Sequence, residues 1–120
     1  MSKKTILVVD DEEVIREFLT EVLSEDFFVA TATDGDEAIE QLTHKQFDLV
    51  ITDMKMARVQ GEEVVKFTKE TYPTSEVIVI SGYSSLYSVG QTVNSGAFAF
   101  LSKPFSIKEL ISTVNEAVGC

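Results

Sequence analysis

The stretch ILVVDDEE, residues 6–13, decides the fold of this 120-residue chain. Its first half is a short run of branched aliphatic residues, which is typical of a strand buried on both faces of a parallel sheet. Its second half is four consecutive acids, and residues 14–23 then carry apolar side chains at the spacing of an amphipathic helix. The stretch therefore predicts a strand, a turn rich in carboxylates and a helix.

The same unit of strand and helix recurs along the rest of the chain. Apolar or alternating runs predict further strands at residues 28–32, 49–52, 77–80 and 97–101. Apolar stripes predict further helices around residues 38–42, 64–68, 86–94 and 107–118. Strands that alternate with helices form a parallel sheet with helices on both faces, so we expect an α/β, doubly wound, five-stranded sheet. The flavodoxin-like strand order 2-1-3-4-5 is favoured, because it makes strands one and three neighbours and brings their terminal acids together.

Length and composition indicate a single domain covering residues 1–120. The chain is 44% hydrophobic, which is enough for one core, and its formal charge is −10. A field of that sign repels phosphate backbones and anionic lipid, so we expect no direct contact with nucleic acid or membrane. The lone Cys120 and the absence of a long apolar run near the N-terminus are typical of a cytoplasmic protein.

Polar side chains with complementary chemistry follow four of the five predicted strands. Asp10 and Asp11 follow the first strand, Asp53 the third, Ser81 the fourth and Lys103 the fifth. The carboxyl ends of parallel strands share one edge of the sheet, and open α/β sheets bind ligands at that edge. Taken singly, each of these residues is more often a helix cap or a surface group. Together they indicate a functional site.

Three carboxylates at one edge imply a divalent cation, because like charges raise each other's pKa. Ligands that are all oxygen suit Mg²⁺, with Asp11 and Asp53 as direct ligands and Asp10 acting through water. A carboxylate that faces such a metal can attack phosphorus and form an aspartyl phosphate. Lys103 and the Ser81 hydroxyl would then neutralise the phosphoryl oxygens. Glu12 is expected at the mouth of this pocket.

The order and spacing of these motifs resemble a response-regulator receiver domain over essentially the whole chain. The motifs are Val9-Asp10-Asp11-Glu12, Asp53 with Met56 and Gly61, Ser81-Gly82, Gly96-Ala97 and Lys103-Pro104-Phe105. The resemblance implies that Asp53 accepts a phosphoryl group from a phosphohistidine on a sensor histidine kinase or a histidine phosphotransfer protein. The chain would then be a signalling switch, and its catalysis would be limited to its own phosphotransfer and slow autodephosphorylation.

The resemblance also implies roles around the acceptor. Asp10 and Asp11 would hold Mg²⁺ together with Asp53 and the backbone carbonyl of Lys55. Lys103 would pair with the acyl phosphate through a loop in which the Lys103-Pro104 bond is cis. Ser81 would move to hydrogen-bond the phosphoryl group, and Phe100 would be the aromatic switch residue that turns inward behind it.

The output surface is expected on the face formed by the fourth helix, the fifth strand and the last helix. Residues 86–94 are weak helix formers, so this element is suited to move, and Tyr87 on it would report the state to a downstream protein or output domain. Phosphorylation could also drive formation of a homodimer. Lys55 and Tyr83 border the path of attacking water and are expected to modulate the lifetime of the aspartyl phosphate.

Three other functions compete with this interpretation. A haloacid-dehalogenase-like phosphatase also uses an aspartate, Mg²⁺ and a lysine, but its nucleophile ends strand one in an Asp-x-Asp pattern that residues 10–12 lack. A flavodoxin-like electron carrier needs a phosphate loop rich in Ser, Thr and Gly where this chain has four acids. A phosphorylation-independent receiver that serves only as a binding module usually lacks one of the acids or the lysine.

Overall fold

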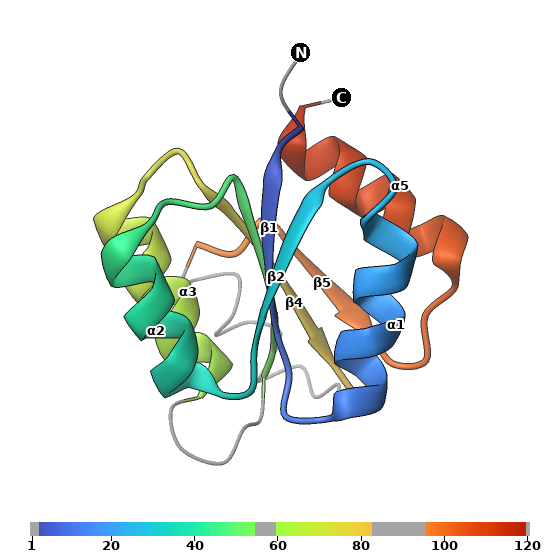
Figure 1. Cartoon of the computed structure of the whole chain (residues 1–120), viewed down its shortest axis with the longest axis horizontal. Helices are drawn as coiled ribbons and strands as arrows, with labels where there is room; N and C mark the ends of the chain where they lie inside the picture. The colour runs from blue at the N-terminus through green and yellow to red at the C-terminus, as the bar shows by residue number, and fades with distance from the viewer. Residues whose placement is uncertain (1–2, 55–59, 83–95, 120) are drawn as a thin grey trace.

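The computed structural model describes residues 3–54, 60–82 and 96–119. Five parallel strands form one sheet in the order β2-β1-β3-β4-β5, and helices cover both of its faces (Figure 1). The strands are β1 (Thr5–Val9), β2 (Phe28–Ala32), β3 (Leu49–Asp53), β4 (Glu76–Ser81) and β5 (Ala99–Ser102). The helices are α1 (Glu13–Leu23), α2 (Gly35–His44), α3 (Gly61–Thr71) and α5 (Ile107–Val118). The predicted fold class and strand order are confirmed.

The central strand β1 shows why the sheet carries helices on both sides. Alternate residues of a strand point to opposite faces. Ile6 and Val8 pack into the apolar cluster with α1 and α5, whereas Leu7 and Val9 pack into the cluster with α2 and α3. All four side chains are fully buried, as the unbroken aliphatic run predicts.

Two predictions about elements need comment. The fifth strand begins at Ala99 instead of the predicted residue 97, because Gly96 has a left-handed φ of 101° and turns the chain just before it. The first hydrogen bond to the neighbouring strand is donated by the Phe98 amide to the Val77 carbonyl, at 2.7 Å. The helix predicted at residues 86–94 lies outside the described residues.

Helix starts differ in how they are capped. The side chains of Asp34 and Ser106 accept hydrogen bonds from backbone amides in the first turns of α2 and α5, at 2.9 and 3.0 Å. Glu12 and Gln60 are the N-cap residues of α1 and α3, and their side chains accept no capping hydrogen bond from the first turn. These two uncapped helices follow β1 and β3, the strands that end in the acids.

The junction between β3 and α3 is unusually close. The Gly61 amide donates to the Met54 carbonyl at 2.9 Å, which seats the start of α3 against the end of β3. A Cβ atom at Gly61 would lie 2.1 Å from the backbone carbonyl oxygen of Asp53. Only glycine fits this approach, and the approach fixes the backbone that carries Asp53.

Within the described ranges, no helix is long and apolar enough to cross a membrane. The Lys103-Pro104 peptide bond is cis, as the resemblance implies. The start of β1 and the end of α5 lie at the same end of the molecule, opposite to the end where the predicted site residues follow the strands (Figure 1).

Candidate functional site

Acidic side chains meet where β1 and β3 end. Val9 of β1 is paired with Thr52 of β3. The next residues along the two strands, Asp10 and Asp53, are therefore neighbours. Asp10 is fully buried and Asp53 is 7% exposed. One carboxylate oxygen from each residue of the set Asp10, Asp11, Glu12 and Asp53 lies within 4.8 Å of the other three. We call this set the acidic cluster.

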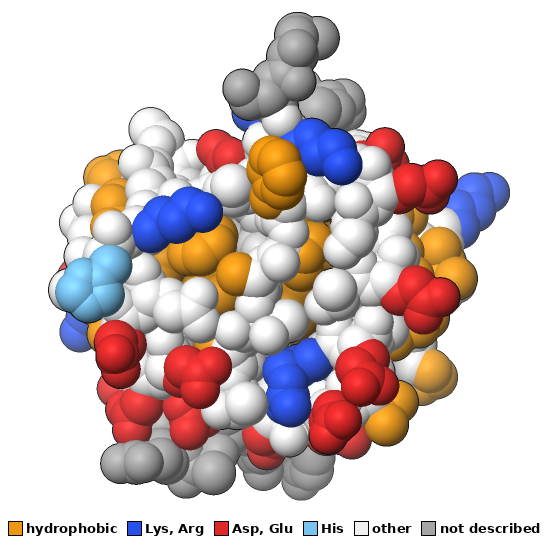
Figure 2. All heavy atoms as spheres, viewed as in Figure 1, with side chains coloured by type: hydrophobic (Ala, Val, Ile, Leu, Met, Phe, Trp, Pro, Cys, Tyr) orange, Lys and Arg blue, Asp and Glu red, His pale blue; other side chains and the backbone are white. Residues whose placement is uncertain are grey.

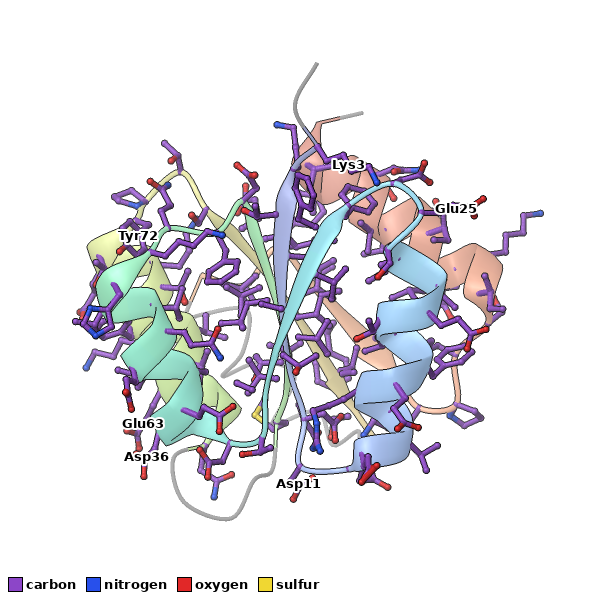
Figure 3. The ribbon with its side chains drawn as sticks, in the orientation of Figure 1. Lys3, Asp11, Glu25, Asp36, Glu63 and Tyr72 are labelled. Carbon is purple, nitrogen blue, oxygen red and sulfur yellow. The ribbon has the colours of Figure 1, made fainter. Side chains whose placement is uncertain are left out.

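The cluster occupies the edge of the sheet that the sequence predicts. Asp11 lies at the turn between β1 and α1, at the lower end of the molecule in Figure 3. The face shown in Figure 2 has acidic side chains gathered along its lower half, toward the same edge. The surface toward this end of the sheet is therefore rich in acids, and the four carboxylates of the cluster would attract a cation.

Backbone amides hold one oxygen of each buried acid. The Glu12 amide donates to Asp10 Oδ1 at 2.8 Å, and the Met54 amide donates to Asp53 Oδ1 at 2.8 Å. The Oδ2 atoms of both aspartates face the Lys103 ammonium, at 3.2 Å from Asp10 and 3.6 Å from Asp53. The two carboxylates are thus oriented before any ligand binds.

Lys103 follows β5, the edge strand, and its side chain reaches the acidic cluster. Its backbone amide donates to the Ser81 carbonyl at 2.8 Å, which holds the residue after β5 against the end of β4. Its ammonium contacts Asp10 and Glu12 at 3.2 Å each. Burial would lower the Lys103 pKa, but the negative charges of Asp10 and Asp53 raise it overall, so the side chain is a fixed cation.

Charge repulsion remains in the cluster despite Lys103. Burial, together with the charge of Asp10, raises the pKa of Asp53 from 3.8 to about 6. Burial also raises the pKa of Asp10. One ammonium therefore does not compensate the carboxylates, and a divalent cation would relieve the remaining repulsion. The cluster offers only carboxylate oxygens, the ligand type that Mg²⁺ prefers.

Ser81 lies on β4, the strand next to Asp53, and Phe100 lies on β5, one strand further out. Asp53 is paired with Ile80, so Ser81 is one position further along β4, and its side chain is buried. Phe100 is opposite Val79 in β5, is half-buried and packs against the apolar cluster under α2 and α3. The switching roles of Ser81 and Phe100 stay predictions.

Some predicted residues cannot be placed. Lys55, Tyr83 and Tyr87 lie outside the described residues. Glu12 is exposed and belongs to the acidic cluster, while its expected position at the mouth of a pocket stays a prediction.

Sequence analysis missed Arg16, whose Nη1 donates to the backbone carbonyl of Asp10 at 2.8 Å. A signal for it existed, because long side chains in the first turns of a helix point back toward the helix start, where the acidic turn lies.

Known proteins resemble this chain along nearly all of its length. The family model described as the response regulator receiver domain matches residues 6–115. The response regulator protein PilR of Pseudomonas aeruginosa is 36% identical over an alignment of 117 residues, and the match covers 94% of this chain and 26% of PilR. The chain spans about a quarter of the length of the first curated relatives that it matches.

Solved structures agree with the sequence match. A CheY-like receiver domain from Methanospirillum hungatei has a TM-score of 0.95 and 28% identity, with 98% of this chain and 95% of that chain covered. The BeF3-activated receiver domain of DrrB has a TM-score of 0.93 and 27% identity, with 99% of this chain and all of that chain covered. The phosphatase and electron-carrier interpretations therefore fail. This chain belongs to the response regulator receiver domains of two-component signalling systems.

Proposed function

We propose that Asp53 accepts a phosphoryl group from a phosphohistidine on a sensor histidine kinase or a histidine phosphotransfer protein. The observation that carries this proposal is the position of the Asp53 carboxylate. It is nearly buried, belongs to the acidic cluster and has its Oδ2 atom 3.6 Å from the Lys103 ammonium. A carboxylate held in this way can act as a nucleophile toward phosphorus with little reorganisation.

Asp10, Asp11 and Asp53 are the residues that would hold Mg²⁺, and the resemblance adds the backbone carbonyl of Lys55. When bound, the ion would neutralise charge on the phosphoryl oxygens and on the carboxylates. The raised pKa of Asp53 supports this assignment, because a group that is hard to ionise alone is easier to ionise beside a cation.

The chain's own residues account for the transfer. Asp53 Oδ2, the oxygen that the Met54 amide does not bind, attacks phosphorus, and the bond from phosphorus to the donor imidazole breaks. Lys103 donates to the phosphoryl oxygens from its position 3.6 Å from Asp53 Oδ2. The Ser81 hydroxyl supplies a further hydrogen bond. Hydrolysis of the resulting acyl phosphate returns the switch to its starting state.

Phosphorylation would change the output face through β4 and β5. A phosphoryl group shifts a two-state equilibrium only by making different contacts in the two states. The contacts available here are those of Ser81 and Lys103, whose backbones are joined by one hydrogen bond. We propose that Phe100 follows Ser81 and that the surface formed by the segment 86–94, β5 and α5 reports the change.

The partners on the output side follow from the same surface. A downstream protein or output domain would read it, and a phosphorylation-dependent homodimer is a second form of readout. The net charge of −10 disfavours direct contact with nucleic acid. We propose that residues 1–120 act as one receiver domain.

Phosphorylation of Asp53 is tested with acetyl phosphate and Mg²⁺. We expect intact-mass analysis of the wild type to show a gain of about 80 Da, the mass of one phosphoryl group. Asp53→Asn should show no gain, while Asp26→Asn, an exposed carboxylate away from the site, should behave as the wild type. An unmodified wild type would instead favour a binding module that works without phosphorylation.

A further inference from the structure

Glu12 makes a contact that its position in the fold does not require. Its side chain is 62% exposed, yet Oε1 lies 3.2 Å from Lys103 Nζ. The ammonium also donates to Asp10 at 3.2 Å and lies 3.6 Å from Asp53. Within the described residues, the two hydrogen bonds of the Lys103 ammonium therefore go to Asp10 and Glu12, and the acceptor Asp53 receives the longest of the three contacts.

The residue type at position 12 points in the same direction. Glu12 is the N-cap of α1, where Ser, Thr, Asp and Asn are preferred because their short side chains reach the free amides of the first turn. Asp34 and Ser106 do this at α2 and α5, whereas Glu12 does not. Its longer side chain instead reaches across the edge of the sheet to Lys103. The start of α1 thus lacks a cap, and the ammonium gains a second partner.

An exposed ion pair adds little to folding stability, so the contact is cheap to break. The contact matters more for which negative group the Lys103 ammonium binds. A phosphoryl group on Asp53 needs the Lys103 ammonium, and every hydrogen bond that the ammonium gives to Glu12 competes with that need. Glu12 is suited to this competition because it can leave Lys103 without leaving a buried charge unpaired.

We propose that Glu12 is a positioning residue that holds the Lys103 ammonium away from Asp53 until a phosphoryl group arrives, and so disfavours the phosphorylated state. This inference rests on the proposed function of Asp53. Glu12 would act through Lys103 and would need no contact with the phosphoryl group.

The test measures the affinity for beryllofluoride, which mimics a phosphoryl group on a carboxylate, at saturating Mg²⁺. Glu12→Gln keeps the shape and removes the charge, and we expect binding to tighten on the order of two- to fivefold, the strength of an exposed ion pair. Glu13→Gln is the matched control: it makes the same change in net charge at the next residue, also exposed. It should leave the affinity near that of the wild type.

A double-mutant cycle with Lys103→Gln separates the routes by which Glu12 could act. In that background Glu12→Gln should no longer change the affinity, because no ammonium remains to be held. Glu12→Ser supplies a capping side chain, so it should raise the unfolding midpoint and tighten binding together. If Glu12 served only to stabilise the fold, its replacement by Ser would not be expected to raise the unfolding midpoint and the affinity for beryllofluoride at the same time.

Several outcomes would overturn the inference alone. Equal tightening by Glu13→Gln would show a long-range effect of charge, and tightening that persists in Lys103→Gln would show that Lys103 is not involved. Weaker binding of beryllofluoride by Glu12→Gln would show that Glu12 supports Mg²⁺ binding and does not oppose the phosphorylated state. Failure of the wild type to take up a phosphoryl group from acetyl phosphate would instead overturn the proposed function, and this inference with it.

Discussion

Replacing Gly61 by alanine is expected to destabilise the protein by about 3 kcal/mol or more. The new Cβ would lie 2.1 Å from the Asp53 carbonyl oxygen and 2.9 Å from Met54 Cα. Both atoms belong to the backbone at the end of β3, so no flexible side chain can move aside to make room. Urea unfolding followed by circular dichroism measures the loss as a lower midpoint at an unchanged slope.

Gly82→Ala provides the matched control for this substitution. Gly82 also follows a strand end at the site, but among the described residues a Cβ there would meet only the Lys103 side chain, with Cβ at 3.9 Å and Cδ at 4.0 Å, which are ordinary contacts. We expect Gly82→Ala to stay within about 0.5 kcal/mol of the wild type. Equal stability of the two variants would show that α3 does not press on β3 as the structure has it.

Asp53→Asn is expected to stabilise the metal-free protein at neutral pH. Asp53 is nearly buried, and burial together with the Asp10 charge raises its pKa from 3.8 to about 6. The ionised carboxylate therefore costs the folded state on the order of 2 to 3 kcal/mol. A neutral amide of the same shape removes most of this cost, and we expect a higher free energy of unfolding at pH 7.5.

The pH dependence of this difference has a definite sign. The folded state keeps the Asp53 proton up to about pH 6, whereas the unfolded chain releases it near 3.8, so the folded state binds more protons in between. Stability contributed by the protonated group is fully present below pH 4 and is lost as the pH rises through 6. The advantage of Asp53→Asn should therefore be absent near pH 4, grow across this window and level off above it.

Magnesium provides a second check on the Asp53 prediction. An ion that binds the folded state alone stabilises it by mass action, so Mg²⁺ should raise the wild-type midpoint and reduce the advantage of the variant. Asp26→Asn, at an exposed site, controls for the loss of one charge. A wild type that is as stable as Asp53→Asn without Mg²⁺ at pH 7.5 would contradict the electrostatic description of the cluster.

The sequence was sufficient for the fold, and it predicted that the residues after β1, β3 and β5 would lie close together. The aliphatic run at 6–9 and the acids after it predict β1, its burial and the edge where Asp10 and Asp53 meet. The spacing of apolar residues in the sequence does not show which of several nearby groups a side chain contacts. The preference of Lys103 for Asp10 and Glu12 over Asp53 depends on distances of 3.2 to 3.6 Å that only coordinates provide.

The pattern of apolar residues also does not predict two further features of the fold. The close approach at Gly61 depends on where α3 meets β3, which is a matter of packing between elements. The fifth strand starts at Ala99 and not at the predicted residue 97, because Gly96 has a left-handed backbone conformation and bends the chain. Element boundaries are decided by such local backbone geometry, which apolar runs do not encode.

Borohydride reduction tests the central claim most directly, because it converts an aspartyl phosphate into homoserine at the residue that carried it. The protein is treated with acetyl phosphate and Mg²⁺, reduced, digested and mapped by peptide mass spectrometry. Homoserine at position 53 and nowhere else is the predicted result. Homoserine at Asp10 or Asp11, or an unreduced Asp53 in a protein that has gained a phosphoryl group, would contradict the account.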